Sequence, residues 1–358
     1  MGEFPAHPDN VEPEWLAGKL RDAGVLSDAA ITSLRWEPIG TGQVGDSVRY
    51  HVEYDRSDAG PATIAGKFPA ADPTSRSTAA AFSLYRKEVG FYRELHPSLE
   101  IRVPRPLAAE LAENGVDFIL LFEDLGPARG GNQLAGCTIE DARVAIVQAA
   151  ELHAPSWGNA ALTGLGWLHS GPEVTSQIKA LYPQAQASFR ERYDGLLAPE
   201  LMQTCADLAA ASDLWFGRET KVPCLVHGDF RLDNMLFDIK GGAEPIAVLD
   251  WQTIQTGSGL TDIGYFLGCG IGSSLRRAHE DELLALYIEE MGRRGVALTR
   301  TGIWDLYRIG ALHGLSTAVF SAAFVERTVR GDENFLSMAR GAAQLALDHD
   351  SLDALKGS

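Results

Sequence analysis

The first part of the chain passes from a helical to a β pattern of apolar positions. Residues 1–35 read as a polar, helical lead-in whose apolar positions are Trp15, Leu16, Leu20 and Val25. Between Val48 and Tyr54 apolar and polar residues alternate, as expected for a half-buried strand. A turn-forming cluster over 55–61 separates this strand from a second predicted strand at 63–68. The pattern therefore predicts a pair of strands soon after the lead-in.

Beyond the strand pair the pattern becomes mainly helical. Helical spacing runs from Arg76 to His96 and is stopped by Pro97, and a short apolar run of strand length follows at 116–122. A Gly- and Pro-rich break then precedes a long remainder in which helical patterns predominate. Short strands are expected within this remainder around 224–226, 235–237 and 246–249.

These elements predict an α+β fold with two lobes. Residues 1–123 would form a small N-terminal lobe built on an antiparallel sheet, and 124–131 a hinge. Residues 132–358 would form a larger, mainly helical C-terminal lobe. The sequence contains no internal repeat and no low-complexity segment that would suggest another architecture.

Composition restricts the class of function. Lys plus Arg number 31 and Asp plus Glu 48, so the formal charge is −17. This charge argues against a nucleic-acid binder, which needs a basic face, and against adhesion to an anionic membrane. No apolar run approaches the roughly 20 residues of a spanning helix, and acidic residues in the first 25 positions argue against a signal peptide. The four cysteines form no C-x-x-C pair, so we expect a reduced, soluble, cytoplasmic protein without a zinc site.

A glycine-rich segment precedes the first predicted strand. Residues 40–45 read GTGQVG, a G-x-G-x-x-G pattern that includes Gly42 and Gly45. In a dinucleotide-binding fold a helix would follow the glycines, whereas here a strand beginning near Val48 follows. This order suits a flap whose backbone N–H groups approach phosphates, to which Ser47 could add a hydroxyl group. A plain hairpin turn is the alternative interpretation.

A lysine and a glutamate are placed to form a buried ion pair. Lys67 lies on the second predicted strand, on the face opposite Ile64 and Phe68. Glu88 lies in the middle of the apolar stripe of the following helix, where an unpaired carboxylate would be costly. We expect Lys67 to supply the partner. The alternatives are an exposed edge lysine and a glutamate that reaches solvent at the margin of the stripe.

The segment 226–235, VHGDFRLDNM, carries the strongest chemical pattern. Asp229 directly follows a short apolar strand, and Asn234 comes five residues later. This spacing suits a carboxylate that accepts a hydroxyl proton and an amide that coordinates magnesium beside phosphates. Asp250 ends the next predicted strand, and a turn through 241–242 would bring it to the same end of a hairpin as Asn234. Asp250 is therefore placed to be a second metal ligand.

HGDFRLDN, together with VLDWQ and LTDIGYFLG downstream, resembles the matching segments of the aminoglycoside phosphotransferase and choline kinase families. These are kinase-like enzymes that phosphorylate hydroxyl groups of small molecules. The resemblance covers roughly residues 35–345 and implies a bilobal protein-kinase-like fold that uses ATP and Mg²⁺. It also implies that Asp229 is the catalytic base and that Asn234 and Asp250 are the magnesium ligands.

The same resemblance implies how a nucleotide is held. Lys67, fixed by Glu88, would bind phosphates, and the hinge backbone at Glu123 and Leu125 would hydrogen-bond adenine. Asp262 would hold the catalytic loop in place rather than contact substrate. Details of the sequence also resemble kinase-like domains fused to some acyl-CoA dehydrogenases, whose acceptors are hydroxyacyl thioesters.

Other marked residues have a structural interpretation beside a functional one. His227 is expected to brace backbone rather than transfer protons, and Arg231 fits either a phosphate contact or a brace of the loop. Aromatic residues could line an acceptor cleft, although residues of this kind more often lie in the core. They are Trp157, Tyr265, Phe266 and Trp304.

The predicted function is an ATP- and Mg-dependent phosphotransferase whose partner is a small molecule with a hydroxyl group. Aminoglycosides, amino alcohols, sugars and hydroxyacyl compounds are the candidate acceptors, with GTP as an alternative donor and a protein as an alternative acceptor. A nucleotide-binding pseudokinase without turnover is the rival, but its usual sign is a lost catalytic residue and none is missing. The charge of −17 does not oppose ATP, because magnesium and one buried lysine would neutralise the phosphates locally.

Overall fold

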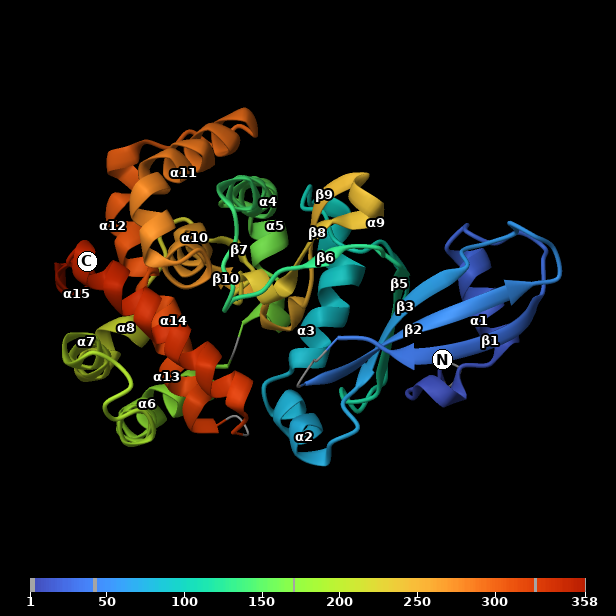
Figure 1. The fold of residues 1–358 in the computed structure, drawn as a ribbon, viewed down its shortest axis with the longest axis horizontal. Coiled ribbons are helices and arrows are strands. Elements are labelled where there is room, and N and C mark those ends of the chain that lie inside the picture. The colour runs from blue at the N-terminus through green and yellow to red at the C-terminus, as the bar shows by residue number, and fades with distance from the viewer. Residues whose placement is uncertain (1–3, 41–43, 170, 325–326, 358) are drawn as a thin grey trace.

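The computed structural model describes residues 4–40, 44–169, 171–324 and 327–357. An antiparallel sheet lies at one end of the molecule and a large group of helices at the other, so that the two termini lie far apart (Figure 1). This is the predicted α+β arrangement of a small sheet lobe and a larger helical lobe.

The sheet of the N-terminal lobe has five strands in the order β1-β2-β3-β5-β4, all paired antiparallel. Its strands are β1 (Ile31–Pro38), β2 (Gly45–Tyr54), β3 (Thr63–Pro69), β4 (Pro106–Leu111) and β5 (Phe118–Glu123). The lobe also contains α1 (Pro13–Asp22), α2 (Pro73–Ala81) and α3 (Leu84–Gly90), and α3 continues into a π-helical turn at Phe91–Leu95.

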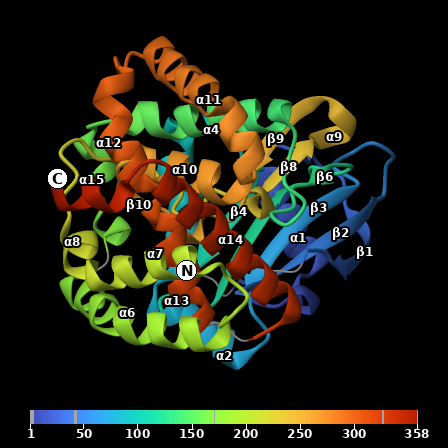
Figure 2. The same cartoon turned by 60° about the vertical axis from the view of Figure 1, so that its left-hand side comes forward.

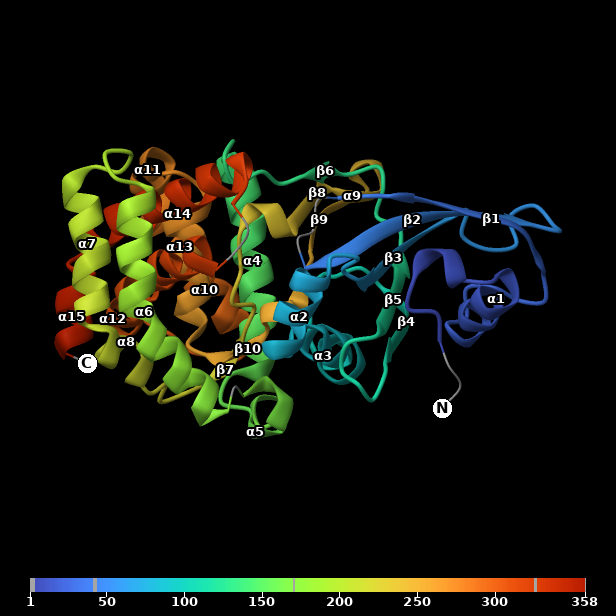
Figure 3. The same cartoon turned by 90° about the horizontal axis from the view of Figure 1, so that it is seen from below.

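Helices cover both faces of this sheet, because alternate strand residues point to opposite sides. Ile119 and Leu121 of β5 belong to the apolar cluster that includes α1, whereas Phe118 and Leu120 belong to the cluster that includes α3. Figure 3 shows α1 and α3 separated by the strands. Lys67 pairs in register with Leu120, so its side chain points toward α3.

The predicted residue ranges of two helical segments, the lead-in and the helix from Arg76 to His96, were wrong. The helical lead-in does not extend to residue 35, because β1 begins at Ile31. This edge strand is half-buried or exposed throughout and therefore lacks a clear apolar alternation. The predicted helix from Arg76 to His96 is interrupted at Ser83, whose left-handed backbone (φ 55°) separates α2 from α3.

The C-terminal lobe is built mainly from helices, and Figure 2 shows α4 and α11 on one side of α13 and α14, with α6 on the other. The helices are α4 (Ile139–Ser156), α5 (Ala160–Thr163), α6 (Pro172–Arg192), α7 (Pro199–Ala210), α8 (Ser212–Gly217), α9 (Ile239–Gly242), α10 (Gly259–Tyr265), α11 (Ser273–Arg293), α12 (Arg300–Gly310), α13 (Leu312–Phe324), α14 (Val329–Asp348) and α15 (Ser351–Gly357). A π-helical turn at Phe266–Gly270 follows α10. No helix in the described ranges is both long and apolar enough to cross a lipid bilayer.

Five short strands of the described residues accompany the helices. They are β6 (Arg129–Gly130), β7 (Cys224–Val226), β8 (Met235–Asp238), β9 (Glu244–Val248) and β10 (Gln255–Gly257). The sequence predicts β7, β8 and β9, whereas β6 and β10 were not predicted. β8 and β9 form an antiparallel hairpin, and β6, which follows the N-terminal sheet, pairs with β8.

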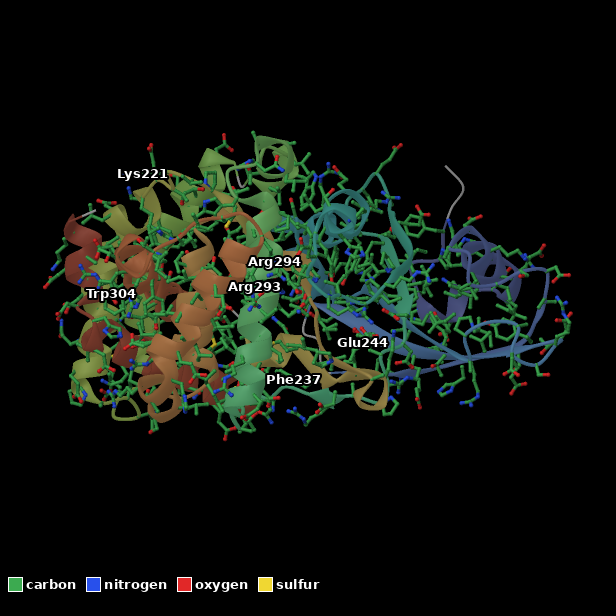
Figure 4. All side chains as sticks on the ribbon, turned by 90° about the horizontal axis from the view of Figure 1, so that it is seen from above. Lys221, Phe237, Glu244, Arg293, Arg294 and Trp304 are labelled. Carbon is green, nitrogen blue, oxygen red and sulfur yellow. The ribbon has the colours of Figure 1, made fainter. Side chains whose placement is uncertain are left out.

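Ion pairs and apolar packing join the two lobes near this hairpin. Arg102, which precedes β4, donates to Glu244 of β9 (2.5 Å) and to Glu123 at the end of β5 (2.7 Å). Glu244 lies near the middle of the molecule (Figure 4). The ring of Phe91 stacks on Trp251 with centroids 3.7 Å apart and an interplanar angle of 2°. The helix that carries Glu88 is thus packed directly against the segment that follows Asp250.

Candidate active site

Lys67 occupies the centre of a buried group of charges. Its Nζ lies 2.8 and 2.7 Å from the two carboxylate oxygens of Glu88 and 3.1 Å from Oδ1 of Asp250. The Glu88 side chain is only 2% exposed, so the predicted pair is confirmed as a buried contact. Burial alone would lower the pKa of Lys67, but the carboxylates of Asp250 and Glu88 outweigh it and raise that pKa. Lys67 is therefore a cation at neutral pH.

Local backbone geometry fixes this group of charges. A Cβ atom on Gly45 would lie 3.1 Å from Cε of Lys67 and 3.1 Å from the carbonyl oxygen of Phe68, so this glycine leaves room for the lysine. Asp250 has a left-handed backbone (φ 64°), an unusual conformation for a residue with a side chain. Strain of this kind concentrates at functional sites.

Three side chains hold the carboxylate of Asp229. Oδ1 accepts from the hydroxyl of Tyr265 (2.8 Å), and Oδ2 accepts from Nδ2 of Asn234 (2.8 Å). Nε of Arg231 lies 3.0 Å from Oδ1. Burial would raise the pKa of Asp229, but Arg231, the Tyr265 hydroxyl, His227 and Asn234 together lower it below its ordinary value. The carboxylate is ionised at neutral pH, as a general base must be.

Asn234 and Asp250 lie side by side at one end of the β8–β9 hairpin, as predicted. The Leu249 N–H donates to the Asn234 carbonyl (2.8 Å), which extends the hairpin register by one residue. The side-chain Nδ2 of Asn234 also donates to the backbone oxygen of Asp229 (2.9 Å). The other polar atom of this side chain, the amide oxygen Oδ1, remains as an acceptor. One amide oxygen and one carboxylate suit Mg²⁺, which takes few protein ligands and keeps water or phosphate in the rest. In the described ranges no group of three or more His, Cys, Asp or Glu residues forms a fuller metal site.

His227 braces the loop, in agreement with its structural interpretation. Its Nδ1 accepts from the Asp229 N–H (3.2 Å), so Nε2 carries the proton and donates to the Leu249 carbonyl (2.9 Å). One imidazole therefore ties Asp229 to the strand that leads to Asp250.

Asp262 on α10 holds the same loop from behind. Its two carboxylate oxygens accept from the backbone N–H groups of His227 (2.7 Å) and Gly228 (3.0 Å). The side chain is fully buried, and His153 lies 3.2 Å away on its other side. Burial would raise the pKa of Asp262, but these contacts lower it, so the group is an anion. It binds backbone, as the resemblance implies.

We predict that Asp262→Asn destabilises the protein by about 1–3 kcal/mol, because an amide has one acceptor oxygen for two buried N–H donors. Urea denaturation followed by circular dichroism would measure the free energy of unfolding. Asp207→Asn is the matched control, since Asp207 is exposed on α7 and its carboxylate accepts from Gln203 (2.8 Å). Equal urea midpoints for the two variants would contradict the prediction.

The predicted nucleotide-contacting residues lie in three places. Gly42 falls outside the described residues. Gly45 and Ser47 are on β2, where Ser47 pairs in register with Lys67. Glu123 and Leu125 follow β5, and the Glu123 side chain pairs with Lys240 (2.8 Å) as well as Arg102. Some backbone groups of Glu123 and Leu125 are hydrogen-bonded within the protein. The Glu123 N–H donates to the Arg105 carbonyl (3.0 Å), and the Leu125 carbonyl accepts from the Lys240 N–H (2.9 Å).

Two residues that hold the loop 227–234 were missed by sequence reasoning. Asp233 accepts from the Gln133 N–H (2.8 Å) and lies 3.1 Å from Nη1 of Arg231, so it ties the catalytic loop to the segment before α4. Gly131 in that segment lies so close to the loop that a Cβ would be 2.0 Å from the Leu232 oxygen. Asp233 lies inside the motif 226–235, but no role was predicted for it. Tyr265, considered for an acceptor cleft, is instead fully buried.

The sheet, the Lys67–Glu88 pair and the loop that carries Asp229 and Asn234 define a protein-kinase-like phosphotransferase fold. Residues 44–298 match the model of the ecdysteroid kinase-like family, EcKL, and the chain belongs to this family of small-molecule kinases.

Solved structures show the same fold across nearly the whole chain. A protein of Ralstonia eutropha JMP134, described as a candidate aminoglycoside phosphotransferase, is 17% identical with a TM-score of 0.54, covering 94% of this chain and 98% of its own. Aminoglycoside 2'-phosphotransferase-IIIa, in a GDP complex, is 15% identical with a TM-score of 0.53, covering 87% and 94%. Spectinomycin phosphotransferase, with ADP and spectinomycin, is 13% identical with a TM-score of 0.52, covering 96% and 99%.

One short stretch is more similar to a curated protein. Over 42 residues the chain is 52% identical to the mouse (Mus musculus) acyl-CoA dehydrogenase family member 11. The match covers 12% of this chain and 5% of the mouse protein, so this chain corresponds to a small part of that protein's length.

Proposed function

We propose that the protein transfers the γ-phosphoryl group of ATP, in complex with Mg²⁺, to a hydroxyl group of a small molecule. The observation that carries this proposal is the position of Asp250, which lies 3.1 Å from Lys67 and beside Asn234 at the end of one hairpin. A cation for phosphates lies beside one of the two oxygen ligands for a metal, and the other ligand contacts the ionised Asp229 (2.8 Å). Phosphoryl transfer requires these three parts.

We propose that the base held at the hinge is adenine rather than guanine. Since Glu123 N–H and Leu125 C=O are engaged within the protein, a base could meet the Glu123 carbonyl and the Leu125 N–H. Adenine presents an amino donor beside a ring-nitrogen acceptor on its Watson–Crick edge, which complements a carbonyl followed by an N–H. The ADP in one solved relative and the GDP in another agree with a nucleoside diphosphate product at this site.

In the proposed mechanism each charged group has one task. Lys67, held by Glu88, binds phosphate oxygens, while Asn234 and Asp250 hold magnesium. Bound Mg²⁺ would supply charge neutralisation on the phosphates. Asp229 accepts the proton of the acceptor hydroxyl and keeps its oxygen directed at the phosphorus. Arg231 pairs with Asp229 and Asp233, which assigns it to bracing the loop.

A turnover screen tests this proposal. Purified protein would be incubated with Mg-ATP and aminoglycosides, amino alcohols, sugars or hydroxyacyl-CoA thioesters, and ADP release would be measured with a coupled assay. We expect acceptor-dependent ADP release with one class, and parallel reactions with GTP to be slower. Tight Mg-ATP binding with no turnover on any acceptor would favour the pseudokinase alternative. Failure to bind Mg-ATP would overturn both.

A further inference from the structure

One short helix holds three consecutive residues of the catalytic loop. Asp262 on α10 binds the N–H groups of His227 and Gly228, and Tyr265, three residues later, donates its hydroxyl to Oδ1 of Asp229 (2.8 Å). Residues three apart lie on the same face of a helix, so the two side chains reach the loop together. α10 therefore fixes both the backbone of the loop and the side chain of its base.

Tyr265 is itself held in one position. The residue is fully buried, and its ring meets His313 of α13 edge to face, with centroids 5.3 Å apart. Nε2 of His313 in turn donates to the Gly228 carbonyl (2.8 Å). A buried phenol with a single well-placed partner cannot turn to solvent, so its hydroxyl has a fixed direction toward the loop.

We propose that Tyr265 is a positioning residue for phosphoryl transfer, whose hydroxyl fixes the rotamer of Asp229 so that its carboxylate faces the acceptor hydroxyl. The inference rests on the proposed function, because it gives Asp229 the role of base. Tyr265 does not contact substrate. It acts through Asp229, and Asn234 and Arg231 complete the set of donors around that carboxylate.

The other contacts on the carboxylate come from its own loop. Arg231 and Asn234 belong to the same loop as Asp229, and the backbone of Asn234 is tied to the β8–β9 hairpin rather than to α10. Tyr265 reaches the base from a separate, buried helix. Small displacements of a catalytic group reduce rate strongly while leaving ligand binding intact.

Tyr265→Phe tests the proposal, because it removes the hydroxyl and keeps the ring. We expect kcat to fall about 10-fold because the carboxylate is no longer held in place, with KM for ATP nearly unchanged. The loss of one buried hydrogen bond should also lower the melting temperature, by no more than in the matched control. The matched control is Tyr193→Phe, since Tyr193 is equally buried and its hydroxyl donates to Asp332 (2.9 Å), away from the loop. We expect this control to retain the wild-type kcat.

A crystal structure of Tyr265→Phe separates this inference from the proposed function. We expect the Asp229 carboxylate to leave its position while the backbone of 227–234 stays in place. An unmoved carboxylate, or a loss of kcat no larger than in Tyr193→Phe, would overturn the positioning role. If wild-type protein turns over no acceptor, the proposed function fails instead, and the crystal structure still decides whether Tyr265 holds the side chain.

Discussion

Replacing Asp229 with Asn is expected to lower kcat by about 10²- to 10⁴-fold, the usual contribution of a general base. The substitution preserves the shape of the side chain but removes the negative charge that accepts the hydroxyl proton. In the wild-type protein the Tyr265 hydroxyl, the Asn234 amide and Arg231 donate to the two carboxylate oxygens, and an amide keeps only one acceptor oxygen. The new side chain is therefore also expected to be less well oriented.

Binding of Mg-ATP separates this effect from general damage. In the proposed site the phosphates are bound by Lys67 and magnesium, so the Kd for Mg-ATP in Asp229→Asn should stay close to that of wild type. Isothermal titration calorimetry would measure that Kd, and a coupled ADP assay would measure turnover. Asp238→Asn is a suitable control, because Asp238 is exposed and pairs with Arg129 at the far end of β8 (2.9 Å). Near-normal turnover in Asp229→Asn would refute its role as base.

Much of the charged site could be predicted from local patterns. A glutamate inside an apolar stripe requires a cation, and a lysine on the preceding strand is the nearest candidate, which is how Lys67 and Glu88 meet. Asn234 and Asp250 flank two short strands joined by a tight turn, so a hairpin places them together. In both cases short sequence separation and period-2 or period-3.6 spacing carry the information.

The missed features depend on contacts between distant segments. Tyr265 meets Asp229 from 36 residues away, and nothing in its own neighbourhood distinguishes a phenol bonded to a carboxylate from one that only packs. Asp233 meets the Gln133 backbone from 100 residues away. The strand β1 was not predicted for a different reason. It is an edge strand with both faces partly exposed, so its sequence lacks the alternation of apolar and polar residues by which strands are recognised. Local patterns found the charged residues but not what holds them.

The second large effect is expected in Lys67→Met, which should lower the free energy of unfolding by about 3–5 kcal/mol at neutral pH, besides removing phosphate binding. The substitution leaves Glu88, which is 2% exposed, without its cation and close to the charge of Asp250. Desolvation of an unpaired carboxylate is the cause of this loss. Urea denaturation would measure it. The double variant Lys67→Met/Glu88→Gln is the control, and it should be more stable than the single variant because the fully buried carboxylate is gone and only the partly exposed Asp250 has lost its cation.

The destabilisation in Lys67→Met should also depend on pH, with a definite sign. Burial raises the pKa of Glu88, whereas the positive charge of Lys67 lowers it. In Lys67→Met this lowering effect is lost, so the pKa of Glu88 rises further. The folded variant then holds a proton that the unfolded chain releases near the ordinary glutamate pKa of about 4.3. Its stability is therefore greatest below that pH and falls as the pH rises through the raised pKa of the folded state. Urea midpoints measured from about pH 5 to pH 8 should thus fall in Lys67→Met and not in the double variant. A midpoint that rises with pH in the single variant would show that Glu88 finds another cation.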